Sequence, residues 1–127
     1  MKADGSRPIR VLIVDDEEDV RLLLRVQLLQ AGFEVVGEAA DGREAIECCE
    51  RTPVDAVVLD LLMPGMSGFE AIAPLRELNH DVAIIAYSAV AGDYVRKEMA
   101  RLAVPLLLKS GDPAPLVRKI NESVKLR

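Results

Sequence analysis

The sequence has few aromatic residues, few cysteines and one histidine. Its 127 residues include no tryptophan, two tyrosines and two phenylalanines. The one histidine, His80, has no second imidazole with which to bind a metal, so we interpret it as a surface residue. The two cysteines, Cys48 and Cys49, are adjacent, which is a poor geometry for a disulfide between them. These features predict a reduced, cytoplasmic protein that needs no disulfide to fold.

The sequence also lacks an excess of positive charge and any long hydrophobic run. It carries 16 Lys and Arg against 21 Asp and Glu, a net charge of −5. Nucleic acids and anionic membranes attract basic surfaces, so we expect this domain to bind neither directly. No apolar run approaches the length of a membrane span, and the polar segment Met1–Arg10 is not a signal peptide.

Five short apolar runs recur along the chain, each followed by an amphipathic stretch. They are Ile9–Val14, Phe33–Gly37, Val54–Leu59, Val82–Tyr87 and Val104–Leu108. Four of them are rich in Val, Ile and Leu without strict alternation, as in strands that are buried on both faces, so we expect a parallel sheet. The length suits a single domain over residues 1–127, with its core at about residues 9–125.

The stretches between the runs predict helices, and together they predict the fold class. The helices are expected at Asp19–Ala31, Asp41–Arg51, Ser67–Leu78, Ala91–Leu102 and after an N-terminal cap at Asp112. The inner face of the first helix is expected to carry Val20, Leu23, Leu24, Gln27 and Leu28, with Arg21 and Arg25 outside, and that of the second Ala45, Ile46 and Cys49. Gly32 is placed to end the first helix, and Pro74 should kink or shorten the third. Five βα units predict an α/β, flavodoxin-like three-layer sandwich whose doubly wound parallel sheet has the known strand order 2-1-3-4-5.

Polar side chains follow four of these predicted strands. The first run leads into the acids Asp15 to Asp19, the third into Asp60, the fourth into Ser88-Ala89 and the fifth into Lys109. Since open α/β sheets place their chemistry at the carboxyl ends of the strands, we expect these groups to meet at one edge of the sheet.

Asp60 is the most informative of these residues. A carboxylate between two leucines at the end of a buried strand is costly unless something compensates its charge, and Asp15 and Asp16 would add repulsion. A divalent cation would remove both costs, and partly open oxygen ligands suit Mg²⁺. At such a site Asp60 could attack a phosphorus atom, while Lys109 neutralises phosphoryl oxygens and Ser88 donates a hydrogen bond.

Each of these residues also has an ordinary structural interpretation. The acidic run could be a solvated helix N-terminus, Asp60 a helix or turn cap, Ser88 a turn hydroxyl, and Lys109 a surface lysine. Their combination at one edge, in this order along the chain, favours the site.

With these motifs the sequence resembles the receiver domain of bacterial two-component response regulators. The resemblance covers about Arg10 to Val124, and its motifs are Val11–Glu17, Asp60 with Met63–Gly68, Ser88-Ala89 and Leu107–Lys109. Val35–Ala45 is most similar to the NarL/LuxR-type branch, whose members usually carry a C-terminal DNA-binding domain. Because this sequence ends after the last predicted receiver helix, it contains no output domain. It is either a stand-alone receiver or part of a longer protein.

The resemblance implies a role for each residue at the predicted edge. Asp60 would be the phospho-acceptor, taking a phosphoryl group from a sensor histidine kinase. Mg²⁺ would be held by Asp16, Asp60 and the backbone carbonyl of Leu62, with Asp15 acting largely through water. The switch and phosphate-binding residues would be Ser88, Ala89 and Lys109. Such a domain is a signalling protein rather than an enzyme, since it catalyses only its own phosphorylation and dephosphorylation.

The resemblance also implies how a signal would leave the domain. Phosphorylation would reposition the fourth helix and fifth strand. Partners, including a second copy in a homodimer, would bind the face of the fourth helix, fifth strand and fifth helix, at Asp93, Arg96, Lys97 and the outer side of Val117–Lys125. Three features depart from the family pattern. Leu106 replaces an aromatic switch residue, Ser110 replaces a proline that often follows a cis bond, and Pro105 falls inside the predicted fifth strand, which suits an edge strand.

Three alternative functions fit the same fold. A haloacid-dehalogenase-type phosphatase also uses an aspartyl nucleophile, but it needs a second Asp where this sequence has Leu62. A flavin or nucleotide binder would need a glycine-rich phosphate loop, which is absent. A receiver-like interaction module that is never phosphorylated is the third, and Pro105 and Leu106 are compatible with it.

Overall fold

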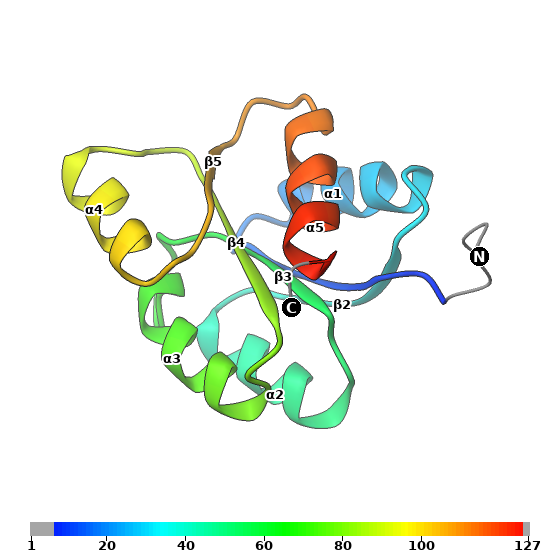
Figure 1. Cartoon of the computed structure of the whole chain (residues 1–127), viewed down its shortest axis with the longest axis horizontal. Coiled ribbons are helices and arrows are strands. Elements are labelled where there is room, and N and C mark those ends of the chain that lie inside the picture. Colours follow the sequence, from blue (N-terminus) through cyan, green and yellow to red (C-terminus); the bar gives the residue numbers. More distant parts are fainter. Residues whose placement is uncertain (1–6, 126–127) are drawn as a thin grey trace.

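The computed structural model of the chain describes residues 7–125, which form one sheet covered by helices on both faces (Figure 1). The strands are β1 (Arg10–Val14), β2 (Glu34–Ala39), β3 (Ala56–Leu59), β4 (Ala83–Ser88) and β5 (Leu106–Leu108). All paired strands are parallel, in the order β2-β1-β3-β4-β5. The predicted fold class and strand order are therefore confirmed.

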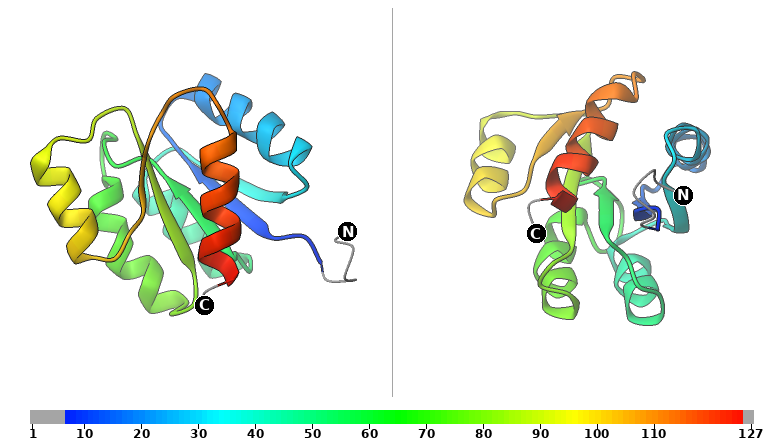
Figure 2. Two further views of the ribbon diagram at one scale, coloured as in Figure 1. Left: turned by 45° about the horizontal axis from the view of Figure 1, so that its top comes forward. Right: turned by 45° about the vertical axis from the view of Figure 1, so that its right-hand side comes forward.

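Helices α1 and α5 cover one face of the sheet, and α2, α3 and α4 lie on the other side (Figure 2). Their bounds are α1 (Glu18–Gln30), α2 (Gly42–Arg51), α3 (Gly68–Leu78), α4 (Asp93–Arg101) and α5 (Ala114–Lys125). Alternate residues of the central strands face opposite sides, so the sheet separates two hydrophobic clusters. Val11 and Ile13 of β1 pack toward α1 and α5, while Leu12 and Val14 pack toward α2 and α3.

The start of α3 shows why the chain folds sharply after β3. Ser67 caps the helix by accepting a hydrogen bond from the Glu70 amide at 3.3 Å, and the Glu70 side chain accepts one from the Ser67 amide at 3.2 Å. This capping box stabilises the first turn by about 1 kcal/mol. Pro74 lies inside α3, which nevertheless continues to Leu78, its predicted end.

Three local predictions are wrong in detail. Pro105 lies just before β5 rather than inside it, and its carbonyl accepts a hydrogen bond from the Ala86 amide at 2.9 Å. Leu23, predicted to face the core, is 51% exposed, because the sheet covers only a narrow stripe of α1. Cys48 rather than Cys49 is the buried cysteine of α2. The predicted cap of the last helix, by contrast, is confirmed: the Asp112 carboxylate accepts a hydrogen bond at 3.0 Å from the amide of Ala114, the first residue of α5.

Other local predictions are confirmed. Gly32 follows α1 with a φ of +92°, a backbone conformation that glycine adopts without steric cost. No cis peptide bond occurs within residues 7–125, so the bond between Lys109 and Ser110 is trans. His80 is exposed in the loop before β4. None of the described helices is long and apolar enough to cross a bilayer.

Candidate functional site

The predicted acidic residues meet at the carboxyl ends of β1 and β3, which are neighbouring strands. Asp15 follows β1 and Asp60 follows β3. Backbone hydrogen bonds continue the sheet past both strand ends: the Asp15 amide donates to Ala39 at 3.0 Å, and the Asp60 amide donates to Val14 at 2.9 Å. Both aspartates therefore leave the sheet from rigid backbone, which fixes where their carboxylates lie.

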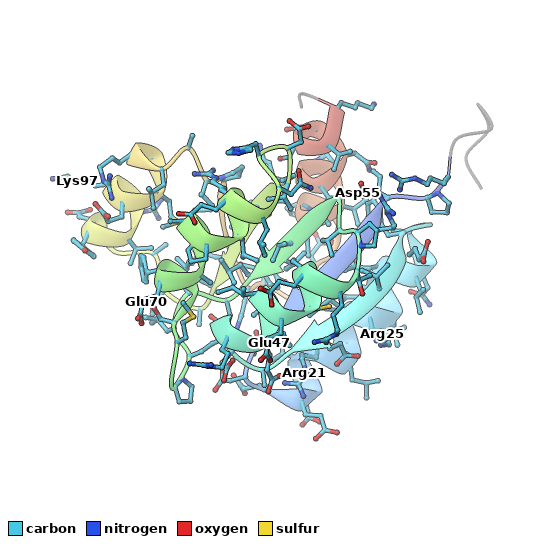
Figure 3. All side chains as sticks on the ribbon, turned by 90° about the horizontal axis from the view of Figure 1, so that it is seen from below. Arg21, Arg25, Glu47, Asp55, Glu70 and Lys97 are labelled. Atoms are coloured by element: carbon cyan, nitrogen blue, oxygen red, sulfur yellow. The ribbon has the colours of Figure 1, made fainter. Side chains whose placement is uncertain are left out.

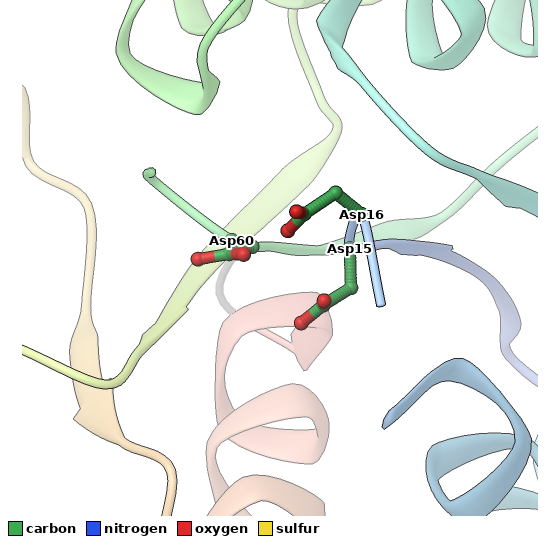
Figure 4. A group of neighbouring side chains, drawn as sticks. All are labelled: Asp15, Asp16 and Asp60. Carbon is green, nitrogen blue, oxygen red and sulfur yellow. The ribbon is translucent and has the colours of Figure 1, made fainter. Parts of the chain in front are cut away.

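Asp15, Asp16 and Asp60 form a compact group of carboxylates (Figure 4). One oxygen from each of the three lies within 4.8 Å of the others. Asp15 and Asp60 are 1% and 5% exposed, whereas Asp16 is exposed and its carboxylate has no hydrogen-bond or ion-pair partner among residues 7–125. Three clustered carboxylates, one of them unpaired, are a donor set that fits a hard divalent cation such as Mg²⁺.

Lys109 forms ion pairs with two of the three acids, Asp15 and Asp60. Its Nζ lies 2.6 Å from Asp15 Oδ2 and 3.4 Å from Asp60 Oδ2. Lys109 comes directly after β5, and its amide donates to the carbonyl of Ser88 at 2.9 Å. The ammonium group of Lys109, which follows the edge strand β5, thus reaches acids that follow β1 and β3, two strands with which β5 does not pair.

The electrostatics of the site follow from this arrangement. Burial raises the pKa of Asp60, and the nearby Asp15 charge raises it further, while Lys109 and the Leu62 amide oppose the shift. Burial by itself would lower the pKa of Lys109, but its hydrogen bond with Asp15 and the charges of Asp60 and Asp15 raise it above its usual value. Lys109 is therefore a fixed positive charge, and Asp60 is a carboxylate held at an energetic cost.

Ser88 and Ala89 complete the predicted set at the end of β4. Ser88 is the last residue of that strand and is 1% exposed, and its Oγ accepts a hydrogen bond from the Val90 amide at 3.3 Å. Ala89 follows it and is exposed. Leu62 follows Asp60 by two residues with its side chain 56% exposed, and its amide lies 3.4 Å from Asp60 Oδ1. The structure thus places each predicted residue at or next to the same edge of the sheet.

The sequence did not predict the roles of two residues of this region, Arg21 and Gly68, the second of which it placed only within the Met63–Gly68 motif. Arg21, assigned only to the outer side of the first helix, donates from Nη1 to the backbone carbonyl of Asp15 at 2.7 Å. Gly68 packs so closely on the backbone of Asp60 and Leu61 that a Cβ atom would lie 2.8 Å from Leu61 Cα. Each role depends on a tertiary contact, which the residue type alone does not predict.

Comparison with known proteins gives the class of the chain. The profile of the response regulator receiver domain matches residues 11–121. The chain therefore belongs to this family, whose members accept a phosphoryl group in two-component signalling, as the sequence motifs indicated.

Among curated relatives, the chain is 35% identical to chemotaxis protein CheY of Thermotoga maritima over 117 residues, 91% of this chain and 98% of that protein. It is 37% identical to the nitrate/nitrite response regulator NarP of Escherichia coli over 123 residues, 94% of this chain but 57% of NarP. It spans 60% of the transcriptional regulatory protein PdtaR of Mycobacterium tuberculosis, at 32% identity. The chain thus matches slightly over half the length of these two regulators.

Solved structures show the same architecture. TrrA of Thermotoga maritima, crystallised with Mg²⁺ and beryllium fluoride, is 32% identical with a TM-score of 0.81, covering 91% of this chain and 98% of that one. The receiver domain of a response regulator NarL from Mycobacterium tuberculosis is 27% identical with a TM-score of 0.85, covering 96% of this chain and all of the other. NarL-type receivers are thus among the structural neighbours, as predicted from Val35–Ala45.

Proposed function

We propose that Asp60 is the phospho-acceptor of this receiver and that Asp15, Asp16, Asp60 and the backbone carbonyl of Leu62 bind Mg²⁺. The observation that carries the proposal is the convergence of three carboxylates with Lys109 bridging two of them. Bound Mg²⁺ would supply positive charge to the oxygens of the transferred group. The structure of TrrA with Mg²⁺ and beryllium fluoride supports this assignment for a relative.

In the proposed reaction, an ionised oxygen of Asp60 attacks the phosphorus of a phosphohistidine. The new bond is an acyl phosphate, the P–N bond breaks, and the histidine nitrogen leaves with the electron pair. Lys109 then exchanges part of its contact with Asp60 for a phosphoryl oxygen. The Ser88 hydroxyl donates a hydrogen bond to another oxygen, and the exposed start of the loop at Ala89 leaves room for that oxygen.

The donor in this proposal is a sensor histidine kinase, and the protein acts in the cytoplasm. It is a signalling domain, and its only catalytic steps are its own phosphorylation and dephosphorylation. The domain itself binds no nucleic acid. In a longer protein of the NarP or PdtaR type, a further domain would carry the output.

The output surface in this proposal consists of α4, β5 and α5, which also is where a homodimer would form. Phosphorylation adds nearly two negative charges at Asp60, and Ser88 and Lys109 move to meet them. Because Lys109 continues β5, the movement reaches this surface directly. Leu106 is partly buried against the cluster beneath α4, so the surface would change without rotation of an aromatic ring.

The two tyrosines are poorly placed to replace that aromatic residue. Tyr87 is 6% exposed and packs in the cluster toward α1 and α5, on the opposite face of the sheet from Leu106. Tyr94 is 72% exposed on α4, with its ring centroid 6.5 Å from that of Phe69.

The test is intact-protein mass spectrometry after incubation with Mg²⁺ and acetyl phosphate. We expect one phosphoryl adduct in the wild-type chain and none in Asp60→Asn or in the presence of EDTA. Absence of the adduct from a folded wild-type chain that binds Mg²⁺ would contradict the proposal. It would favour an interaction module that works without phosphorylation.

A further inference from the structure

A cluster of charged residues lies beside the acidic site, between α1 and β2. Glu38 of β2 accepts from Arg21 Nε at 3.1 Å through one carboxylate oxygen and from Arg25 Nε at 2.6 Å through the other. Figure 3 labels both arginines, on the outer part of α1 next to β2. The Arg21 side chain is 17% exposed and that of Arg25 is 37% exposed, so Arg21 is the more enclosed of two otherwise similar residues.

Arg21 alone of the two reaches the acidic site. Its Nη1 donates to the backbone carbonyl of Asp15 at 2.7 Å. That carbonyl belongs to the peptide group that joins Asp15 to Asp16. The carboxylate of Asp15 is held separately, by Lys109 at 2.6 Å and by the Glu17 amide at 2.9 Å.

Asp16 depends on this peptide group for its position. Its own carboxylate has no partner among residues 7–125, so no side-chain contact there determines where it points. The orientation of the preceding peptide plane sets the direction in which the Asp16 side chain leaves the backbone. A guanidinium group that is fixed by Glu38 and donates to the Asp15 carbonyl restricts rotation of that plane.

We propose that Arg21 is a positioning residue for the metal site: anchored by Glu38, it holds the Asp15–Asp16 peptide so that the Asp16 carboxylate faces Asp60. The inference rests on the Mg²⁺ site proposed above. Groups that orient metal ligands in this way typically contribute 10- to 100-fold to metal affinity.

Two possible roles of Arg21, as a nearby charge and as a positioning residue, predict opposite changes in Mg²⁺ affinity when Arg21 is removed. A positive charge near the site repels Mg²⁺, so if Arg21 acted only through its charge, removing it would tighten binding. If Arg21 holds the peptide in place, removing it weakens binding although a repulsive charge has gone. The sign of the change therefore distinguishes the two roles.

The experiment compares Arg21→Met with Arg25→Met in the full chain. Methionine has a similar length but neither charge nor donor, and Arg25 shares Glu38 and the helix with Arg21 without contacting Asp15. Isothermal titration with Mg²⁺ should give a Kd about tenfold higher for Arg21→Met and within about twofold of wild type for Arg25→Met. The chain has no tryptophan, which makes calorimetry preferable to fluorescence.

A second readout needs no metal. The Glu17 amide donates to Asp15, so its hydrogen exchange, followed by NMR with EDTA present, reports how firmly this turn is held. We expect faster exchange at Glu17 in Arg21→Met and an unchanged rate in Arg25→Met. If Arg21→Met does not fold, Arg21→Lys is the second variant. Lysine keeps the positive charge, but it lacks the planar guanidinium that contacts Glu38 and the Asp15 carbonyl at the same time, so Arg21→Lys should also bind Mg²⁺ more weakly.

Unchanged or tighter Mg²⁺ binding by Arg21→Met would overturn the inference, as would equal weakening by both variants. Wild-type binding that is lost in Asp60→Asn supports the metal site itself, whatever the arginine variants do. A wild-type chain that binds no Mg²⁺ would overturn both the site and this role of Arg21.

Discussion

Leu62 and Val90 place exposed apolar side chains next to the phospho-acceptor and the switch hydroxyl. They are 56% and 47% exposed, and their amides contact the Asp60 carboxylate and the Ser88 hydroxyl at 3.4 and 3.3 Å. Apolar groups at these positions hinder a water molecule from approaching an acyl phosphate on Asp60. We therefore interpret Leu62 as a residue that prolongs the phosphorylated state.

Leu62→Asn should shorten the lifetime of phosphorylated protein, because an amide can hydrogen-bond the attacking water. We expect decay at least about threefold faster, a change that needs less than 1 kcal/mol of barrier lowering. The decay is measured by intact mass after removal of the phosphodonor. Leu78→Asn is the control, since Leu78 is 45% exposed at the far end of α3. Equal decay in wild type and Leu62→Asn would show that Leu62 does not screen the site.

The surroundings of Cys49 argue against a nucleophilic or redox role for its thiol. Burial raises the pKa of its thiol to about 11, and the neighbouring Cys48 adds to the shift. Near neutral pH the thiol is therefore protonated and a poor nucleophile. This favours helix packing over a redox role for Cys48 and Cys49, which lie in and against the core cluster.

At the scale of elements, the join between β3 and α3 determines how Asp60 is presented. Gly68, the first residue of α3, lies against the backbone of Asp60 and Leu61, and its amide donates to the Leu61 carbonyl at 3.2 Å. A Cβ atom there would collide with the carbonyl oxygen of Asp60. Both groups are backbone, so neither can move aside as a flexible side chain could.

Gly68→Ala should therefore destabilise the protein and displace Asp60. We expect a loss of about 1–3 kcal/mol, from the usual cost of overpacking, and a much lower yield of phosphoryl adduct. Thermal unfolding followed by circular dichroism measures the first and intact mass the second. The control is Gly92→Ala, because a Cβ atom on Gly92 would have nothing within 4 Å. Similar melting temperatures for both variants would contradict the argument.

Helix α1 combines two roles on different sides. Leu24 and Leu28 are buried against the sheet, while Arg21 faces β2 and the end of β1. The outer side carries exposed apolar residues that the sheet does not cover, namely Leu22, Leu23, Val26 and Leu29. The helix thus contributes to the core through a narrow stripe and to the acidic site through one arginine.

At the scale of the whole molecule, the ionised Asp60 carboxylate opposes folding when no metal is bound. Because burial raises the pKa of Asp60, the folded protein holds this proton more tightly than the unfolded chain does. The ionised group therefore destabilises the fold. This cost is absent well below the ordinary pKa of 3.8, grows as pH rises toward the folded-state pKa, and is constant above it.

Asp60→Asn should consequently stabilise the metal-free protein at pH 7, because the variant carries no buried ionised group at this position. The gain should shrink on acidification, as Asp60 of the wild type takes up its proton. Mg²⁺ should raise the melting temperature of the wild type and have little effect on the variant, because only the wild type keeps the complete site. Scanning calorimetry with EDTA or Mg²⁺ across this pH range measures both effects. A variant no more stable than wild type in EDTA at pH 7 would contradict the prediction.

The chain covers different shares of its relatives. It spans 98% of Thermotoga CheY but 57% of NarP, so the receiver is the part that all these proteins share. The described residues form one sheet with two clusters, and this unit contains all the residues proposed for phosphorylation.

The sequence by itself determined the strands, the helices and the order of the chemical groups. Short apolar runs rich in β-branched residues, such as Val82–Tyr87, favour strands that are buried on both faces, and parallel strands bring the residues after them to one edge. This is why Asp15, Asp60 and Lys109 could be assigned to one site before any distance was known.

Only the tertiary structure decided which groups touch. Pairing of Lys109 with both Asp15 and Asp60 depends on the reach of one side chain across the edge of the sheet. The contact of Arg21 with the Asp15 carbonyl depends on the packing angle of α1, and the exposure of Leu23 on how narrow a stripe the sheet covers. Helical periodicity shows which residues share a face, but the neighbouring elements determine how much of that face is buried.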